Sequence, residues 1–148
     1  KAGIDVEIKA GTASVYFSSD PANPDTYLHF YTDIQMYTTT MTQPDPQRFM
    51  DQFTSWEVAS KENKWAGRNP TRWRNEEYDK TWKAAEAEMD PVKRAALFIK
   101  MNDLVIQNIV VIPVVFRPRV AAINNKMRDA VQSGWDSDLW ALAYWSKA

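Results

Sequence analysis

Apolar and polar residues alternate in several short segments of the chain, and this period of two predicts strands. Isoleucine and valine alternate with charged residues over residues 4–8, which predicts a half-buried strand. Residues 33–41 are rich in threonine and predict a second strand. Two apolar runs near the end of the chain, at 110–116 and 119–123, predict two more. Each strand needs a hydrogen-bonding partner, so together these segments predict a sheet.

Capping signals predict three helices in the middle of the chain. An aspartate followed by a proline at 45–46 is typical of a helix start and predicts a helix over 47–53. Asn75 predicts the next start, because glutamates in the first turn favour the helix dipole. A second Asp-Pro pair, at 90–91, opens a helix over 92–108 that has a broad apolar face.

This order of elements favours an α/β fold, in which two helices in tandem between strands flank a mixed sheet. At 148 residues the chain has the size of one domain with one core. Residues 135–145 fit either a short helix or a strand. Four strands make a small sheet for this many helices. A chain that opens within a strand therefore looks like a piece of a longer protein, or like a processed chain.

The charge balance and the lack of cysteine narrow the class of protein. Lys and Arg number 18 against 19 Asp and Glu, a net charge of -1. A nucleic-acid binder usually carries a clear basic excess, so we expect no nucleic-acid partner. Without cysteine the chain has no disulfide, no thiolate metal site and no cysteine nucleophile. No run of about 18 apolar residues is present, so the sequence predicts no membrane span.

Side chains suited to catalysis or metal binding are sparse. His29 is the only histidine, and its aromatic neighbours indicate a packed or hydrogen-bonded side chain. A Ser-His-Asp site would need His29 and a nucleophile elbow, which this sequence lacks. One histidine is too few for a histidine-based zinc site. The four glycines lie far apart and cannot form a phosphate-binding loop. We therefore expect no enzyme activity, no metal ion and no cofactor.

The polar segment 65–75 combines planar cations, aromatic rings and amide groups. Its candidate ligand-binding residues are Trp65, Arg68, Asn69, Arg72, Trp73 and Asn75. Guanidinium groups bind carboxylates through paired hydrogen bonds and stack on aromatic rings, so the segment fits a polar organic ligand. The alternative is a surface loop whose arginines pair with Glu76 and Glu77. Donors and aromatic rings without an evident base or nucleophile favour binding over turnover.

The same segment carries a spaced motif of asparagines and aromatic residues. Asn69 is followed four residues later by Trp73 and two residues after that by Asn75. The pair Tyr78-Asp79 then leads into the predicted helix. This motif resembles the C-terminal lobe of the periplasmic solute-binding proteins that serve ABC transporters for dipeptides, oligopeptides and nickel.

Other parts of the chain follow the order of that lobe. The opening at 3–8 looks like the family's first strand, and residues 33–37 are similar to the strand that reaches the cleft. Residues 44–49 resemble the Asp-Pro helix start that comes next. Residues 90–95 look like the family's Asp-x-x-x-Arg helix, and 111–113 like its Ile-Pro strand. The resemblance spans nearly all 148 residues, but only about the last third of a typical family member.

The resemblance implies a fold and a role. The fold would be a single C-terminal lobe over residues 1–148, part of a periplasmic-binding-protein type II fold with a mixed sheet and flanking helices. The role would be that of an extracytoplasmic solute-binding component of an ABC importer, whose two lobes close on the ligand. The implied partners are the N-terminal lobe of the binding protein and an ABC permease in the inner membrane. The implied location is the periplasm.

The resemblance also implies three residues of the ligand cleft. Tyr37 belongs to the strand that reaches the cleft, and peptide-binding members carry a tryptophan and an aspartate at positions that fall on Thr39 and Thr42. A neutral hydroxyl does not replace the carboxylate that pairs with a peptide's α-amino group. Together with the nearby arginines, this favours a solute with a carboxylate, a phosphate or many hydroxyls, such as an opine or a sugar conjugate, over a free dipeptide. The implied ligand is a peptide-like or other polar organic solute.

Two other classes of protein remain as alternatives. Seven tryptophans in a domain this small fit a free-standing protein-interaction module with an aromatic partner surface. A small α/β hydrolase that uses two carboxylates is the other, although 19 acidic residues offer no basis for choosing a pair. A bell-shaped pH–rate profile would indicate the hydrolase, and self-association without a ligand would indicate the module.

Overall fold

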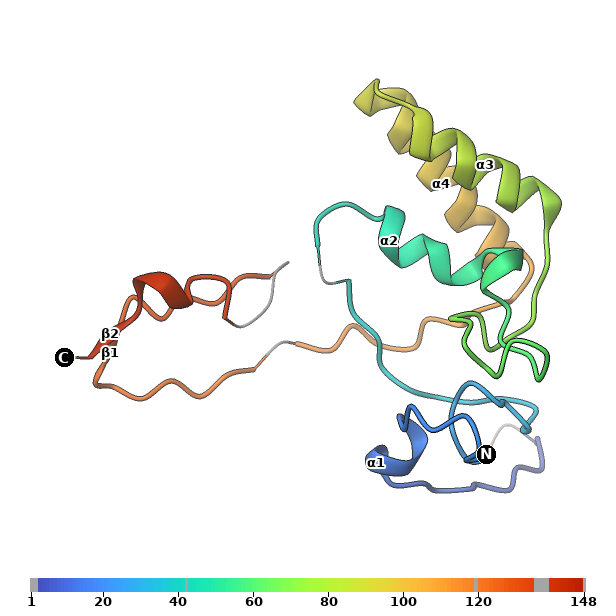
Figure 1. Ribbon diagram of the computed structural model, residues 1–148, viewed down its shortest axis with the longest axis horizontal. Helices are drawn as coiled ribbons and strands as arrows, with labels where there is room; N and C mark the ends of the chain where they lie inside the picture. Colours follow the sequence, from blue (N-terminus) through green and yellow to red (C-terminus); the bar gives the residue numbers. More distant parts are fainter. Residues whose placement is uncertain (1–2, 42, 119, 135–138, 148) are drawn as a thin grey trace.

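The computed structural model describes residues 3–41, 43–118, 120–134 and 139–147. Its helices and 3₁₀ turns (η) are α1 (Ala13–Tyr16), α2 (Gln47–Met50), η1 (Asp51–Phe53), η2 (Ser55–Glu57), α3 (Glu76–Ala87), α4 (Pro91–Gln107) and η3 (Leu142–Tyr144). The strands are β1 (Met127–Arg128) and β2 (Ser146–Lys147). Helices α2, α3 and α4 form one helical body, from which the C-terminal part of the chain runs away (Figure 1).

The core lies between α2, α3 and α4. Its buried residues are Met50, Tyr78, Ala85, Met101 and Val105. The Tyr78 hydroxyl donates a hydrogen bond to the Met50 carbonyl over 2.6 Å, which ties α3 to α2. Burial of one large apolar side chain contributes about 1.5–3 kcal/mol. With five buried residues among those that the structure describes, this core therefore gives the helical body only a modest hydrophobic stabilisation.

The predicted caps Asn75 and Asp90 are confirmed by side-chain hydrogen bonds, whereas the N-cap of α2 is Pro46, one residue after the predicted cap Asp45. Asp45 accepts from the backbone N–H two residues later at 2.8 Å, and Asn75 from the N–H three residues later at 2.9 Å. Asp90 accepts from two successive N–H groups, both at 2.9 Å, and α4 begins at Pro91. Helix α2 passes directly into η1, so the predicted helix over 47–53 is α-helical only in its first half.

The predicted strands form no ladder in the part of the chain that the structure describes. Residues 4–8, 33–41, 110–116 and 120–123 make no backbone pairing with another extended segment, and Phe116 is 95% exposed. The sheet found among the described residues is the antiparallel pair β1–β2, two residues long on each side. A strand is stable only with a partner for its N–H and C=O groups. The mixed α/β sheet therefore stays a prediction.

The N-terminal part is held by aromatic rings instead of a sheet. Tyr16, Phe17, Tyr27 and Tyr37 contact one another with ring centroids 5.0 to 6.1 Å apart. Gln35 accepts a hydrogen bond from the Tyr16 hydroxyl at 3.0 Å and donates one to the Tyr27 carbonyl at 3.1 Å. This cluster fixes residues 16–37 in spite of the missing strand partners.

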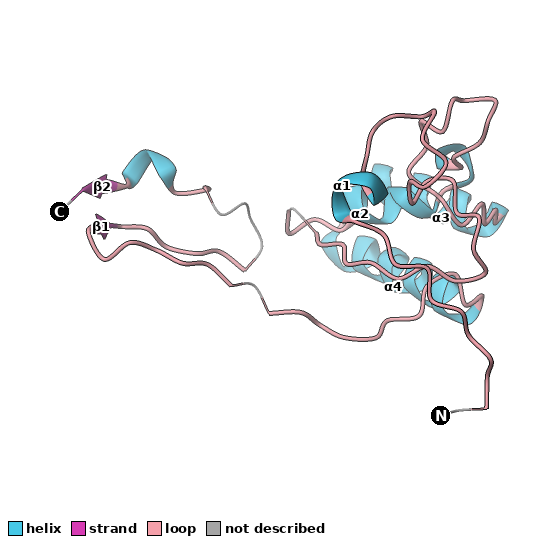
Figure 2. Ribbon diagram, turned by 90° about the horizontal axis from the view of Figure 1, so that it is seen from below, coloured by secondary structure: helices cyan, strands magenta, loops and turns pink. Residues whose placement is uncertain are grey.

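Seen from below, the C-terminal arm with β1, η3 and β2 lies well apart from the helical body (Figure 2). Residues 135–145, for which the sequence fits a helix or a strand, contain the turn η3 and end just before β2. Residues 135–138 lie outside the described residues. No helix in the described ranges is long and apolar enough to cross a membrane.

Candidate functional site

The loop over residues 57–69 is closed by its own backbone. The N–H of Asn69 donates to the Glu57 carbonyl at 2.7 Å, and the N–H of Ala59 donates to the Asn69 carbonyl at 3.1 Å. Gly67 passes so close to the first of these segments that a Cβ atom on it would lie 2.1 Å from the Glu57 oxygen. Glycine at this position allows the two backbone segments to approach this closely. The two hydrogen bonds then fix the positions of Arg68 and Asn69.

Asn69 lies inside this loop, with 1% of its surface exposed. Its Nδ2 donates to the carbonyls of Thr54, at 3.1 Å, and Trp73, at 3.0 Å. Its Oδ1 accepts a hydrogen bond from the Thr71 hydroxyl at 2.8 Å. Both ends of the amide are thus engaged within the chain, and the structure gives Asn69 a bracing role in place of an exposed position for a ligand.

Trp73 and Asn75 support helix α3. The Trp73 ring packs against the Tyr78 ring at a centroid distance of 5.2 Å, next to the core. Asn75 is the cap residue of α3. Two of the residues predicted to bind ligand therefore have a clear structural function at the helix start.

The arginines of the segment do not pair with the glutamates at the start of α3. Glu76 pairs with a lysine of its own helix at 2.6 Å, and Glu77 with a lysine of α4 at 2.7 Å. Arg68 binds the Asp51 carboxylate at 3.2 Å, and Arg74 donates to a backbone carbonyl at 3.1 Å. The predicted alternative, a surface network of arginines with these glutamates, is thus replaced by bonds to η1 and to the backbone.

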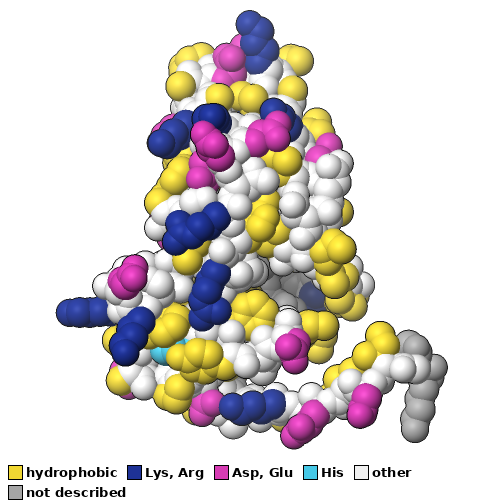
Figure 3. All heavy atoms as spheres, turned by 90° about the vertical axis from the view of Figure 1, so that its right-hand side faces the viewer, with side chains coloured by type: hydrophobic (Ala, Val, Ile, Leu, Met, Phe, Trp, Pro, Cys, Tyr) yellow, Lys and Arg dark blue, Asp and Glu magenta, His cyan; other side chains and the backbone are white. Residues whose placement is uncertain are grey.

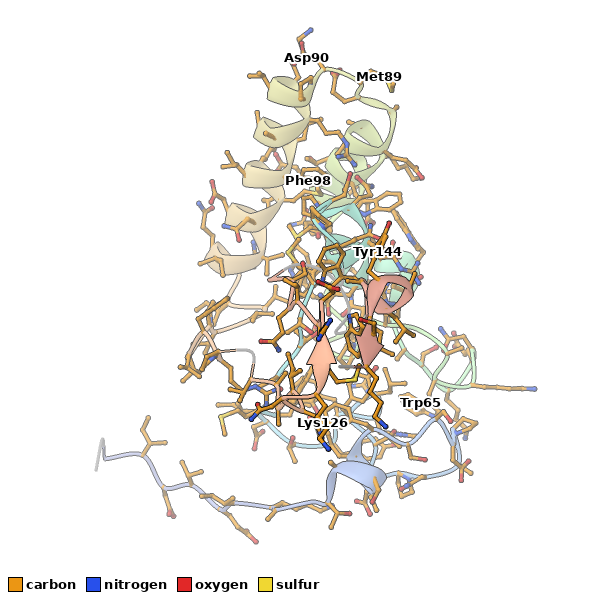
Figure 4. All side chains as sticks on the ribbon, turned by 90° about the vertical axis from the view of Figure 1, so that its left-hand side faces the viewer. Trp65, Met89, Asp90, Phe98, Lys126 and Tyr144 are labelled. Carbon is orange, nitrogen blue, oxygen red and sulfur yellow. The ribbon has the colours of Figure 1, made fainter. Side chains whose placement is uncertain are left out.

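Trp65 forms the centre of a second aromatic group. The His29 ring lies 4.1 Å from the Trp65 ring, and the Arg72 guanidinium lies 5.6 Å from its centroid. Arg72 also donates to the His29 carbonyl, so the loop and the N-terminal part are joined here. Figure 4 shows Trp65 at the opposite end of the molecule from Met89 and Asp90.

The backbone near Trp65 is strained. Trp65 has a φ of 60°, Arg72 of 58° and Phe30 of 43°, all in the left-handed region that disfavours side chains of this size. His29 is buried, and its Nδ1 lies 2.7 Å from the Thr26 hydroxyl, so the predicted packed histidine is confirmed. The tight packing around His29 leaves it as a structural residue.

A polar cavity of about 120 Å³ is lined by described residues of the segments before α2 (39–41, 43 and 45), by α2 and η1, and by Arg68. The side chains that matter for its chemistry are Thr39, Gln43, Asp45, Arg48, Gln52 and Arg68. The cavity brings together Thr39 and Arg68, two of the residues predicted to bind ligand. Thr42, the neighbouring predicted residue, lies outside the described residues. Tyr37 belongs to the aromatic cluster of the N-terminal part and does not line the cavity.

The carboxylate in this cavity is already paired. Arg94 reaches across from α4 and donates to both oxygens of Asp45, at 2.6 and 3.1 Å. These hydrogen bonds, with that from the Gln47 N–H, hold the pKa of Asp45 below its ordinary value. Asp45 is therefore ionised at neutral pH, but its charge is compensated from within the chain.

Sequence reasoning missed the cavity residues on α2 and η1. Arg48 lies on α2 and Gln52 on η1, four residues later, and the only signal for them was their position just after the Asp-Pro helix start. Arg48 is exposed, and its guanidinium has no hydrogen-bond or ion-pair partner among the described residues. Among the described residues that line the cavity, it is the charged side chain without an ion-pair partner.

A wider hollow of about 480 Å³ lies between α3 and α4, but its charges neutralise one another. The ion pairs formed by Glu76 and Glu77 account for both of its lysines. Figure 3 shows acidic and basic side chains intermixed over this part of the surface. Among the residues described, no group of three His, Asp or Glu side chains is placed to hold a metal ion. The smaller polar cavity is therefore the better candidate for ligand binding.

No protein-family model, no curated protein and no solved structure matches this chain. The resemblance to a family thus depends on the spaced motif and on the order of the other segments along the sequence. What the chain does must be argued from the geometry of the cavity and of the unpaired segments.

Proposed function

We propose that this chain is the C-terminal lobe of an extracytoplasmic solute-binding component of an ABC importer, and that it captures a polar organic solute for a membrane permease. The observation that carries the proposal is the cavity beside α2, which unites Thr39 and Arg68 from segments 29 residues apart in the sequence. The sequence predicts both residues to bind ligand, and both line this cavity.

The chemistry of the cavity supports binding without turnover. Hydroxyl, amide and guanidinium groups surround the space, and these groups recognise polar ligands by hydrogen bonding. The one histidine of the chain, His29, is buried elsewhere and bonded to Thr26. Asp45 is the one carboxylate among the described residues that line the cavity. Its pairing with Arg94 lowers its pKa, which makes it a poor general base.

The unpaired extended segments support a second lobe as partner. Residues 4–8 and 110–116 carry apolar side chains that are largely exposed, and Ile8 is 85% exposed. Contiguous exposed apolar surface marks a site of protein contact. In the proposal, the N-terminal lobe of the same binding protein covers these segments, and the assembled protein works in the periplasm.

One observation favours the interaction module as a second candidate. Several aromatic side chains outside the cavity are exposed, among them Tyr31, Trp56 and Tyr144. Exposed aromatic residues are frequent anchors of protein interfaces. Such a module would associate with a protein partner and would ignore small solutes.

The test is a titration of the purified protein with peptides, opines and sugar conjugates, in which tryptophan fluorescence reports binding. The proposal expects one of these classes to bind, and it expects Arg68→Ala to weaken that binding by more than about 1 kcal/mol. Arg74→Ala is the matched control, because Arg74 belongs to the same segment, 65–75, but does not line the cavity. Circular dichroism verifies that both variants fold.

Two results would count against the proposal. Equal affinity in the wild type and in the Arg68 variant would show that the solute does not bind in the cavity. No binding by any solute, together with association that grows with protein concentration, would favour the interaction module.

A further inference from the structure

We infer that Arg48 anchors a carboxylate end group of the solute in the cavity beside α2. The inference rests on the proposed function, since it names the chemical class of the group that the proposed site would take. It also adds a residue that no sequence motif had marked. Three properties of the cavity carry it: its volume, its charge and its unused hydrogen-bond donors.

The volume limits what enters the cavity. Pockets that enclose a drug-sized ligand have volumes of roughly 300–1,000 Å³, whereas this cavity has about 120 Å³. A carboxylate end group suits so small a space better than a whole dipeptide or sugar ring does. The cavity therefore takes only the end of a larger solute, and the remainder lies outside it.

Arg48 is the charged side chain of the cavity that forms no ion pair among the described residues. Asp45 is paired with Arg94, and Arg68 is paired with Asp51. The Glu57 carboxylate accepts a hydrogen bond from the Arg68 backbone N–H at 3.1 Å, so a further negative charge lies near Arg68. The single positive charge of Arg48 matches a carboxylate, which carries one negative charge. A phosphate, with roughly 1.5 to 2 negative charges at neutral pH, would bring more negative charge than Arg48 offsets.

The donors converge on the same space. The backbone carbonyl of Arg48 accepts a hydrogen bond from Arg68 Nη2 at 3.1 Å, which holds the two arginines side by side. Arg68 uses one N–H for this bond and one for Asp51, so its guanidinium keeps further donors for a ligand. The forked donors of Arg48 suit the two oxygens of a carboxylate, and Thr39 also lines the cavity.

The experiment uses sodium propionate as the probe, with propionamide as its neutral counterpart and inorganic phosphate as a competing anion. Binding to the purified protein is followed by NMR of the arginine side-chain Nε–H groups. Propionate is expected to bind in the millimolar range, as befits so small a ligand. It should shift the Arg48 signal, whereas propionamide should leave that signal unchanged.

Substitutions identify the anchor. Arg48→Gln should weaken propionate binding tenfold or more, because it removes the charge but retains an amide donor. The affinity of Arg48→Lys for propionate should lie between those of the wild type and Arg48→Gln, since lysine retains the charge but loses the paired donors of the guanidinium. Arg117→Gln is the matched control, because Arg117 is an exposed arginine that does not line the cavity. It should bind propionate like the wild type.

Several outcomes would overturn the inference and leave the proposed function standing. These are equal binding by the wild type and Arg48→Gln, tighter binding of phosphate than of propionate, and no response to propionate at tens of millimolar. The proposed function fails separately, and only when the panel of peptides, opines and sugar conjugates also gives no binding.

Discussion

Replacing Asn69 with alanine separates a structural role for this residue from a role in ligand binding. The sequence placed Asn69 among the ligand-binding residues, whereas the structure buries its amide between Thr54, Thr71 and Trp73. Truncation to alanine removes both donors and the acceptor at once. The variant should therefore lose stability first, and any effect on ligand binding should follow from the disturbed loop.

The size of the loss follows from the groups that are left behind. The Thr54 carbonyl retains a second hydrogen bond from the Glu57 N–H, at 3.3 Å. The Trp73 carbonyl has no other hydrogen bond among the described residues. A buried polar group left unpaired costs about 1–3 kcal/mol, and an ordinary neutral bond contributes about 1 kcal/mol. The expected loss is about 2–4 kcal/mol, a large share of a typical stability of 5–15 kcal/mol.

Thermal unfolding followed by circular dichroism measures this loss. At about 2–4 °C per kcal/mol for a chain of this size, Tm should fall by roughly 5–15 °C. Asn102→Ala is the control, because Asn102 is exposed on α4 and makes no side-chain hydrogen bond to another described residue. It should stay within about 0.5 kcal/mol of the wild type. If Asn69→Ala kept the wild-type Tm but bound solute more weakly, the bracing role argued from the buried amide would be refuted.

Two further predictions concern the loop crossing and the ion pair at the cavity. Gly67→Ala should destabilise the protein by more than about 2 kcal/mol, because its Cβ would meet the Glu57 backbone at 2.1 Å; a chemical denaturation midpoint equal to that of the wild type would contradict this. The pKa of Asp45 is lowered, first of all by its hydrogen bond to Arg94. The ion pair therefore stabilises the fold fully at pH values above the ordinary carboxyl pKa of 3.8. This stabilisation is lost as the pH falls through the lower pKa that Asp45 has in the folded protein. The carboxylate is partly exposed, so Asp45→Asn should cost under about 1 kcal/mol at pH 7, and its Tm difference from the wild type should shrink below about pH 4 in melts at a series of pH values.

The helices could be predicted because their signals are local. A cap residue such as Asn75 or Asp90 bonds to N–H groups two or three residues away, so the sequence alone contains both partners. The strands could not be confirmed in the same way. The alternation over 4–8 indicates which side chains would share a face, but a ladder needs a second segment in register, and the described residues supply none.

The binding residues divide along a similar line. Asparagine and tryptophan suit ligand recognition by their chemistry, but the same groups also cap helices and brace loops, as Asn69 and Trp73 do. Only the contact between distant segments distinguishes these uses. Arg48 could not be predicted for the same reason. It lies on a short helix and belongs to no sequence motif, and only the folded chain brings it next to residue 39.

The cavity and the unpaired segments are physically connected. One wall of the cavity is Thr39 and its neighbours, at the end of the extended segment 33–41, which has no ladder partner among the described residues. The other wall, with Arg48, stands on the helical body and is fixed by the core. Under the proposed function, pairing of residues 33–41 with the second lobe would hold the first wall in place and reduce the ordering cost of binding. The solute should therefore bind this chain more weakly than it binds the assembled two-lobed protein, whereas the contribution of Arg48 should be the same in both.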